Sequence, residues 1–408
     1  MKYFIITLGC QMNYADSERL AGYYEARGFE LAKSEKEADL VIINTCMVRQ
    51  KAEDRIYGLV NNLFKLNPRP KIIVTGCFVG AMEREPSGQM KKYAKERMPL
   101  ALSSTSRSRE VDEFLLMDEV GWDNLPKRKD KKTAWLPISN GCNNMCSYCI
   151  VPFSRGKEVS RPFEEIIKEA EDLIKAGYEE VTLLGQNVNS YGADVILSES
   201  RHMSGRVEGY NLYSSAPLRS ARNDNEKTEY ELPNGQTVKP VMVKSMGRAR
   251  IPTLFPYLLE EIAKMPFKKI TFISSNPWDF SDELIEVIAK YKNIKREIHL
   301  PVQSGDDEIL KKMNRHYTQV EYLNLIKKIK DKIPEAEFTT DIIVGFPGET
   351  EEQFQNTVDL CQQVNFNVAY IACYSPRPGT AAEKMEDNIE WKEKKRRFHV
   401  LDELINRK

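Results

Sequence analysis

Cys142, Cys146 and Cys149 place three thiols within eight residues of the chain. Thiolates so close in sequence converge only if the backbone wraps around a shared object, usually a metal centre. Structural zinc takes four Cys or His ligands, and the nearest histidine in sequence, His202, is 53 positions after Cys149. A 4Fe-4S cluster held by three cysteines instead keeps one iron open for a small molecule. A helix that buries these cysteines is disfavoured, because glycine, asparagine and proline flank them.

Cys10, Cys46 and Cys77 share a different regularity, since each follows an apolar segment that is typical of a strand. In an open parallel sheet the carboxyl ends of the strands form one edge, where ligands bind. A single cysteine of this kind is more often a small buried hydrophobic residue, but the placement common to all three favours a shared site. The sequence therefore predicts a second three-cysteine cluster with an open iron.

The other residues with chemical potential are weaker candidates. Cys361 falls in a helical pattern and Cys373 in a strand pattern, and we expect both to be core residues. His299 stands near a strand end, where it either lines a site or is a hydrogen-bonded structural histidine. Glycines within residues 184–187 and 344–349 would let the backbone approach a ligand, although tight βα turns need glycine in any case.

The first hundred residues alternate between strand and helix patterns. We expect strands at residues 2–8, 39–44 and 71–75, and helices at residues 16–27 and 49–66. Strands separated by helices form βαβ units and a parallel sheet. The sequence thus predicts an α/β domain over residues 1–120, followed by a charged linker at 121–133, whose basic run at 127–132 we expect to be a solvated connector.

The alternation resumes after the linker. We expect strands at residues 134–139, 180–184, 269–274, 297–302, 338–344 and 367–374, and helices at 163–176, 282–291, 317–332 and 350–364. Six strand–helix units over residues 134–385 make either a doubly wound sheet or a partial (β/α) barrel.

Two segments interrupt or follow this pattern. Residues 196–235 are rich in Ser, Arg, Asn and Glu with few aliphatic residues, which favours a disordered insertion ending in a turn at 232–236. Residues 386–408 form a C-terminal helical region with a basic run, which is either a solvated helix face or an RNA contact: Lys392, Lys394, Lys395, Arg396 and Arg397.

Composition narrows the class of protein. The 408 residues indicate two to three domains, and 41% apolar residues suffice for a sizeable core. The 60 basic and 60 acidic residues cancel, so a partner held by bulk positive charge is disfavoured. The opening apolar run is too short for a signal peptide, and no stretch reaches the length of a membrane span. With eight cysteines and no secretory signal, we expect a cytoplasmic protein with metal or redox chemistry and not a disulfide scaffold.

The motifs resemble a known family. Cys142, Cys146 and Cys149 after a first barrel strand resemble the radical S-adenosylmethionine (SAM) signature, and together with an N-terminal three-cysteine domain they are similar to the methylthiotransferases. Further motifs resemble the tRNA-2-methylthio-N(6)-dimethylallyladenosine synthase branch: Gly9-Cys10-Gln11-Met12-Asn13, Asp16-Ser17-Glu18, and residues 141–152, 155–162, 184–192 and 300–305.

The resemblance implies a fold, cofactors and roles. It implies a Rossmann-like parallel α/β domain followed by a partial (β/α)6 radical SAM barrel. Cys142, Cys146 and Cys149 would hold the 4Fe-4S cluster that binds SAM and releases a 5′-deoxyadenosyl radical. Cys10, Cys46 and Cys77 would hold a second 4Fe-4S cluster that carries or donates sulfur. Residues flanking SAM would be Tyr148, Gly185, Gln186, Gln303, Ile343 and Gly345.

The implied reaction puts a methylthio group on carbon 2 of N(6)-dimethylallyladenosine at position 37 of the tRNA anticodon loop, using two SAM. The implied partners are that loop and an electron donor such as flavodoxin or ferredoxin, with a monomeric enzyme and no membrane. The sequence ends at Lys408 without the C-terminal RNA-binding TRAM domain that is usual in this family, so we expect weak tRNA binding. The insertion around residues 198–250 is a second departure, because most relatives lack it.

Two alternatives remain. A sister methylthiotransferase would act on threonylcarbamoyl-adenosine of tRNA or on a ribosomal-protein aspartate; Gln11-Met12-Asn13 argues against both, by resemblance. A non-enzymatic iron–sulfur electron carrier is the alternative of another class, although carriers normally close their clusters with four protein ligands.

Overall fold

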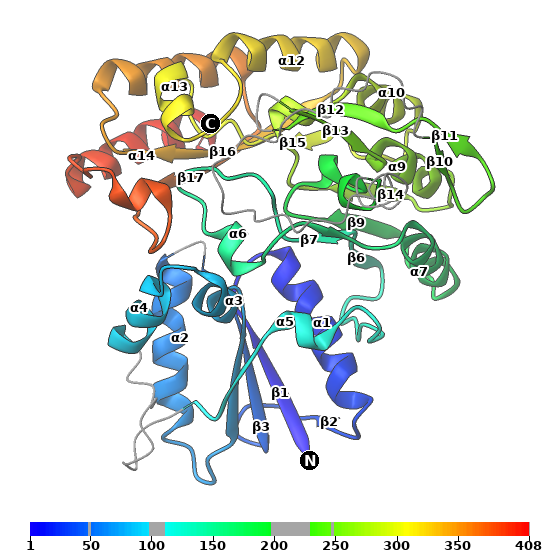
Figure 1. Ribbon diagram of the computed structural model, residues 1–408, viewed down its shortest axis with the longest axis vertical. Helices are drawn as coiled ribbons and strands as arrows, with labels where there is room; N and C mark the ends of the chain where they lie inside the picture. The colour runs from blue at the N-terminus through cyan, green and yellow to red at the C-terminus, as the bar shows by residue number, and fades with distance from the viewer. Residues whose placement is uncertain (48–49, 98–110, 197–228, 246–248, 408) are drawn as a thin grey trace, which may run out of the picture.

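The computed structural model describes residues 1–47, 50–97, 111–196, 229–245 and 249–407. Figure 1 shows two parts, an N-terminal α/β domain and a larger barrel-like domain stacked on it. Among the described helices, each is too short or too polar to cross a bilayer.

The N-terminal domain is a five-stranded parallel sheet in the order β2-β1-β3-β4-β5. Its strands are β1 (Lys2–Thr7), β2 (Glu30–Leu31), β3 (Leu40–Thr45), β4 (Lys71–Gly76) and β5 (Glu113–Leu115). Helix α1 (Gln11–Glu25) packs on one face, while α2 (Gln50–Leu63), α3 (Cys77–Arg84) and α4 (Gln89–Arg97) cover the other. The short helix α5 (Met117–Val120) follows β5. The predicted parallel α/β domain is confirmed.

Helix α1 begins five residues earlier than the sequence predicted. Asp16 was taken as its first residue, but the helix starts at Gln11, with Cys10 as the capping residue. The amide oxygen of Asn13 accepts the Cys10 backbone N–H at 3.3 Å and so closes the first turn. Asp16 therefore lies inside the helix, where it is fully buried.

The second domain is a partial barrel of six parallel strands. These form two three-stranded sheets, β14-β9-β6 and β15-β16-β17. The strands are β6 (Thr133–Pro137), β9 (Glu180–Leu184), β14 (Lys269–Phe272), β15 (Glu297–His299), β16 (Glu337–Val344) and β17 (Val368–Cys373). Between the sheets, the described residues make one isolated parallel bridge, Ile270 to Ile294. The six predicted strands are present, and their order is that of the barrel and not of a doubly wound sheet.

Helices cover the outside of the barrel (Figure 1). They are α7 (Phe163–Lys175), α9 (Phe255–Ala263), α10 (Asp282–Lys290), α12 (Gln319–Lys332) and α13 (Glu351–Val364), with α14 (Trp391–Ile405) packed along β17. Every second residue of each strand points to these helices and joins one continuous apolar core, so the alternate residues face the barrel interior. Short helices α6 (Val151–Ser154) and α11 (Asp307–Lys312) lie in the loops that follow β6 and β15.

The predicted insertion falls mainly on residues 197–228, which lie outside the described residues. The turn predicted at 232–236 is confirmed, because the Gly235 N–H donates to the Leu232 carbonyl oxygen between β10 (Tyr230–Glu231) and β11 (Thr237–Val238). A second antiparallel hairpin, β12 (Val241–Ser245) with β13 (Ala249–Thr253), was not predicted. Burial alternates along β12, where Val241 and Val243 are buried and Met242 and Lys244 are exposed, but the apolar Met242 hides this alternation in the sequence.

Arg128, within the basic run predicted to be a solvated connector, packs against both domains. The Arg128 side chain is only 10% exposed and pairs with Glu169 of α7, while Glu18 of α1 lies 4.0 Å away. Arg128 is therefore packed between the two domains, while Lys127 and residues 129–132 are exposed, as expected of a solvated connector.

Candidate functional site

The N-terminal cysteines lie at neighbouring strand ends. Strands β1, β3 and β4 are adjacent and in register, with Thr7 opposite Asn44 and Asn44 opposite Thr75. Cys10, Cys46 and Cys77 follow these strands and so emerge at one edge of the sheet. A Cβ on Gly9 would lie 2.9 Å from the Cβ of Cys46, which shows how closely the first two loops approach. Cys10 is exposed, and the other two cysteines are buried.

Two buried asparagines fix these loops. The Asn13 amide donates to Asn44 Oδ1 at 3.2 Å and to the Thr45 carbonyl oxygen at 3.0 Å, and the Asn44 amide donates to the Asn13 carbonyl oxygen at 2.7 Å. Gly9 has a positive φ of 131°, and a Cβ there would lie 2.3 Å from Asn13 Oδ1. Sequence reasoning missed Asn44, although a polar residue ending the apolar run of β3 was a visible signal.

Cys142, Cys146 and Cys149 lie in a loop between β7 (Ser139–Asn140) and α6, not in a helix. The Cys142 N–H donates to the Gly156 carbonyl oxygen at 3.1 Å. Gly141 has a φ of 85°, and a Cβ there would lie 1.9 Å from the Lys157 carbonyl oxygen, so only glycine fits. This geometry agrees with the sequence argument against buried cysteines on a helix.

The two cysteine sets face each other across the domain interface. The electrostatic influence of Cys77 reaches Cys149, and that of Cys10 and Cys77 reaches Arg155. Helix α6 packs on α3, and Ile150 and Phe153 join the apolar cluster that contains Cys77 (Figure 1). The chain thus brings six cysteine side chains to one region from two domains.

Burial keeps two of these thiols protonated. Burial raises the pKa of Cys142 well above its ordinary value and raises the pKa of Cys149 to about 12, with a further contribution from Cys146. A bound metal displaces such protons, since a coordinating thiol is deprotonated outright. None of the eight cysteines, all within the described residues, forms a disulfide bond.

The donor set fits a cluster better than a single ion. Among the described residues, no three Cys, His, Asp or Glu side chains are close enough to hold one metal ion. A 4Fe-4S cluster spreads its cysteine ligands over different irons, and three cysteines leave one iron open. Three thiols per set without a fourth Cys or His match that requirement.

The predicted SAM-flanking residues lie around the mouth of the barrel. Tyr148 and Ile343 pack on one apolar cluster. Gly185 ends β9, and a Cβ there would lie 2.8 Å from Ser139 Oγ; Gln186 Oε1 accepts the Gly141 N–H. Gln303 has a φ of 68°, a strained conformation for a residue other than glycine and one that clusters at functional sites.

The glycine at position 345 has a packing role in the structure. It is predicted to flank SAM, and in addition a Cβ there would lie 2.4 Å from Cγ of Lys394 on α14. Gly345 N–H donates to Glu349 Oε2 at 2.7 Å. The glycine therefore accommodates the C-terminal helix.

His299 is hydrogen-bonded inside the barrel, to Thr339 Oγ1 at 3.0 Å and Asp341 Oδ2 at 3.3 Å. His299 therefore lines the barrel interior and is also a hydrogen-bonded structural histidine, so both interpretations of the sequence remain compatible with the structure. Cys361 lies in the barrel core and Cys373 packs against it, as predicted.

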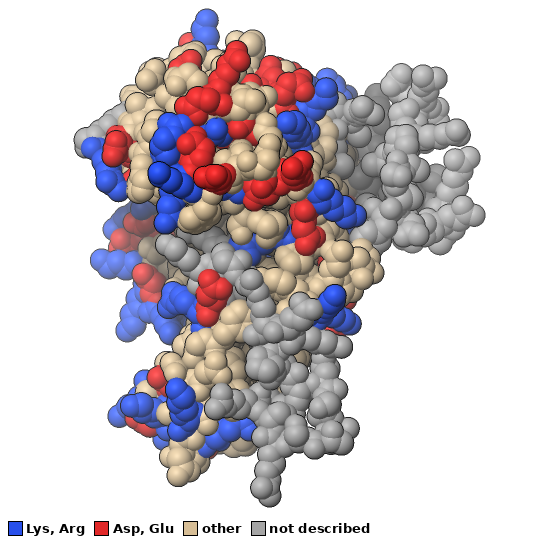
Figure 2. All heavy atoms as spheres, turned by 90° about the vertical axis from the view of Figure 1, so that its left-hand side faces the viewer, with Lys and Arg blue, Asp and Glu red and all other residues tan. Residues whose placement is uncertain are grey.

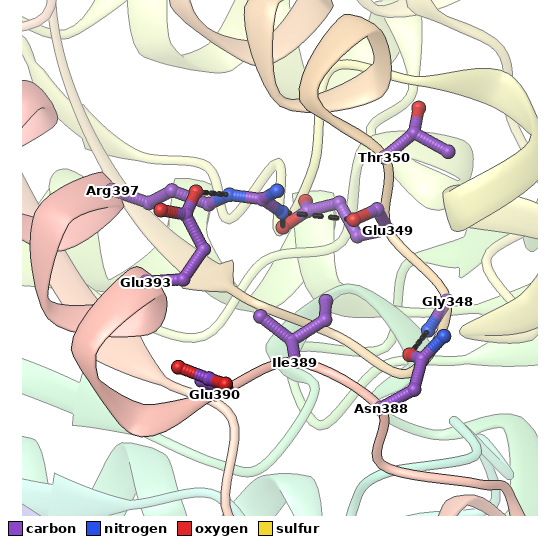
Figure 3. Close-up of a pocket in the computed structure, with 8 residues that line it drawn as sticks. All are labelled: Gly348, Glu349, Thr350, Asn388, Ile389, Glu390, Glu393 and Arg397. Carbon is purple, nitrogen blue, oxygen red and sulfur yellow. Dashed lines mark hydrogen bonds and ion pairs between the residues drawn. The ribbon is translucent and has the colours of Figure 1, made fainter.

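The basic run of α14 is mostly engaged with carboxylates. Lys394 is buried and its ammonium group lies 2.6 Å from Asp387. Arg397 is buried between Glu349 and Glu393, at 2.8 Å from each (Figure 3). Neither residue is a solvated helix face or available to a phosphate. On the face seen in Figure 2, acidic and basic side chains are intermingled over the barrel part.

A cavity of about 380 Å³ lies beside Arg397 and its two glutamate partners, between the start of α13 and α14. Figure 3 shows Glu349 and Glu393 directed at Arg397, with Asn388 bonded to the Gly348 N–H at 3.0 Å. The cavity does not include any of the six cysteines. Its polar groups serve to attach the 345–349 loop to α14.

The comparisons with known proteins agree with this geometry. The model for the Radical SAM superfamily matches residues 136–361, and that for "Uncharacterized protein family UPF0004" matches residues 2–95. A tRNA-2-methylthio-N(6)-dimethylallyladenosine synthase from Shouchella clausii (strain KSM-K16) is 39% identical over 99% of this chain and 70% of the relative. The synthase from Bacillus cereus (strain AH187) is 39% identical over 100% of this chain and 72% of the relative.

This chain belongs to the radical SAM methylthiotransferase family. Methylthiotransferases use two 4Fe-4S clusters and SAM, so the predicted cofactor set and enzyme class are confirmed. A solved radical SAM methyltransferase, TsrM from Kitasatospora setae, has a TM-score of 0.55 at 12% identity and covers 94% of this chain and 74% of that chain. That likeness shows the radical SAM fold alone.

Proposed function

We propose that this methylthiotransferase modifies carbon 2 of N(6)-dimethylallyladenosine at position 37 of the tRNA anticodon loop. The relatives named as synthases of that nucleoside match over nearly the whole chain. The observation that carries the proposal is the packing of α6, which follows Cys149, on α3, which begins at Cys77. A radical source and a sulfur source must both reach one base carbon, and this placement supports that.

We assign Cys142, Cys146 and Cys149 to the SAM-binding cluster, and the three N-terminal cysteines to the second cluster. When bound, these groups supply the electron for SAM cleavage and the sulfur. The chain supplies position and exclusion of water. Ile150 and Phe153 seal the interface beside Cys77 with apolar contacts.

The barrel strands and the adjoining helix α1 carry aromatic side chains suited to a base. Tyr14 of α1 is 45% exposed and its ring lies 5.4 Å from that of Trp135 on β6. Tyr370 of β17 is 52% exposed and its ring lies 5.9 Å from that of His299. Unstacked bases bind RNA-modifying proteins by stacking on such rings. This supports a nucleobase substrate over the alternative of a protein aspartate.

The proposal includes the domain boundaries 1–120, 134–385 and 386–408, an electron donor of the flavodoxin or ferredoxin class, and a monomeric enzyme. A sister enzyme acting on threonylcarbamoyl-adenosine is the second candidate, since 39% identity does not fix the substrate within the family.

The ligand assignment is tested by iron content. After anaerobic reconstitution we expect about eight irons per chain, four per cluster. Replacing Cys10, Cys46 and Cys77 together with Ala should leave about four irons and 5′-deoxyadenosine formation, but no methylthio product. Cys361→Ala is the control, because this core cysteine belongs to neither set. Loss of all iron in the triple variant would refute two separate sites.

The substrate is tested with anticodon stem-loops with and without the dimethylallyl group, at low and physiological salt, with products identified by mass spectrometry. We expect product from the dimethylallylated loop, with binding that weakens as the salt concentration rises. Equal rates on the unmodified adenosine would refute the proposed specificity, and product from a threonylcarbamoylated loop instead would favour the sister activity.

A further inference from the structure

Arg315 is a buried arginine that contacts Cys146, one of the three cysteines assigned to the SAM-binding cluster. Its side chain is 6% exposed, and Nη1 lies 3.7 Å from Sγ of Cys146, within hydrogen-bond reach of a sulfur acceptor. The same nitrogen donates to Asn276 Oδ1 at 2.9 Å, and Nη2 donates to the Pro301 carbonyl oxygen at 2.8 Å. The guanidinium group stacks on Trp278, 4.5 Å from the ring centre. These contacts hold the charge in one orientation.

Hydrogen bonds attach the loop that carries Arg315 to the cysteine loop. The side-chain amide of Asn314 donates to the Met145 carbonyl oxygen at 2.7 Å. Ser147 donates from its N–H to the Met313 carbonyl oxygen and from its hydroxyl to the Lys312 carbonyl oxygen, at 3.0 and 2.7 Å. The contact between the guanidinium group and Cys146 is thus fixed by flanking contacts on both loops.

The charge of Arg315 is not cancelled by an ion pair in the described part of the chain. Its hydrogen-bond partners are neutral amide, carbonyl and phenol groups, together with the sulfur. The nearby carboxylate of Asp279 instead accepts the side-chain amides of Asn187 and Asn189, at 2.6 and 2.8 Å. Arg155, beside Cys10 and Cys77, differs in this respect, because it pairs with Asp16 at 2.8 Å.

We propose that Arg315 is a positioning residue that raises the reduction potential of the cluster on Cys142, Cys146 and Cys149. This inference rests on the ligand assignment under the proposed function. Reduction adds one electron, supplied by a one-electron donor, and so adds one negative charge to the cluster. A buried cation that donates to a ligand sulfur stabilises the reduced form, since net charge and hydrogen bonds to the sulfurs set cluster potentials.

The test is a redox titration with dithionite and mediators, monitored by electron paramagnetic resonance. It uses the full chain with Cys10, Cys46 and Cys77 replaced by Ala, so that only the cluster in question is present. Adding Arg315→Gln should lower the ratio of reduced to oxidised cluster at a fixed potential about tenfold, equivalent to 59 mV for one electron. Arg315→Lys keeps the charge without the fork and should lower the ratio less.

Arg397→Gln is the matched control, because Arg397 is equally buried but pairs with Glu349 and Glu393 on the outer side of the barrel. It should leave the potential unchanged. Iron content separates the possible failures. If every variant holds four irons and Arg315→Gln leaves the reduction potential unchanged, this inference is overturned and the ligand assignment stays intact. The same conclusion follows if Arg397→Gln shifts the potential as much as Arg315→Gln does.

Absence of iron from the triple variant itself would overturn the ligand assignment, and this inference with it. If Arg315→Gln alone fails to hold iron, the reduction potentials of Arg315→Lys and Asn276→Ala test the inference instead. The latter removes the amide oxygen that orients Nη1. A lowered potential in both supports the inference, and the parental potential in both refutes it.

Discussion

Asp16 joins the two domains through buried charges. Its carboxylate lies 2.8 Å from Arg19 of the same helix and 2.8 Å from Arg155 of the barrel domain. The side chain of Asp16 is 1% exposed and those of both arginines are 7% exposed. Asp16→Asn keeps the shape of the side chain but leaves two guanidinium charges buried without a counter-charge. Because breaking a buried pair leaves an uncompensated charge, we expect a loss of about 3–5 kcal/mol of unfolding free energy.

The assay is urea unfolding followed by tryptophan fluorescence, since Trp122 and Trp135 line a small cavity at this interface together with Arg19. For a slope of about 3 kcal/mol per molar urea, the expected loss lowers the midpoint by roughly 1 M or more. Two docked domains need not unfold in one step, so the comparison is between midpoints of the same fluorescence transition.

Asp118→Asn is the control, because this carboxylate is 58% exposed in its pair with Arg84. An exposed pair contributes about 0–1 kcal/mol, so its midpoint should hardly move. The double variant Asp16→Asn with Arg155→Met removes one stranded charge and should recover part of the loss. A shift for Asp16→Asn no larger than that of Asp118→Asn would refute the reasoning.

Three further predictions concern pH, the C-terminal helix and the insertion. Burial raises the pKa of Glu18 from 4.5 to about 7, so between these two pH values its folded form holds a proton that the unfolded form has lost. Unfolding free energy should therefore fall across this range, by up to about 1.4 kcal/mol per pH unit for this group, and urea titrations at each pH should show that Glu18→Gln removes this share of the slope. The buried carboxyls of Glu158 and Asp279, whose pKa values are raised to about 8 and about 7, keep their own shares. Asp387→Asn strands the buried ammonium group of Lys394 and should cost about 3 kcal/mol in urea unfolding, whereas Lys395→Ala on the exposed side should cost about 0.5 kcal/mol or less. Replacing residues 199–227 with a short Gly/Ser linker should change the thermal midpoint by only a few degrees in calorimetry, about 1 kcal/mol or less, and a larger drop would mean that the segment packs on the core.

Strand alternation made most of the fold predictable. Buried parallel strands leave apolar runs of β-branched residues, as in β3, and the cysteines directly after such runs could be placed at one sheet edge without coordinates. The start of α1 was missed because Cys10 and Asn13 form an unusual cap that the common Ser, Thr and Asp signals do not reveal.

The charged partners of the site could not be predicted for a different reason. Arg315 and Cys146 are 169 residues apart, and Arg155 and Asp16 are 139 apart. Local propensity and periodicity carry no information on which distant side chains meet, because such pairs arise only when domains and loops dock. The basic run of α14 shows the same effect, since its pairing with Glu349 and Asp387 depends on the barrel to which it docks.

The two three-stranded sheets of the barrel meet at a seam between β14 and β15 that has few backbone hydrogen bonds. The two half-barrels meet there through the backbone bonds of Ile270 to residues Asn293 and Lys295, at 2.7 and 2.8 Å, while each half keeps its own complete ladders. Few backbone hydrogen bonds therefore join the halves, and the apolar core that spans both of them supplies most of the attachment. We expect the amides of Ile270 and Lys295 to exchange with solvent before those of β9 and β16, which would make this seam the first part of the barrel wall to open.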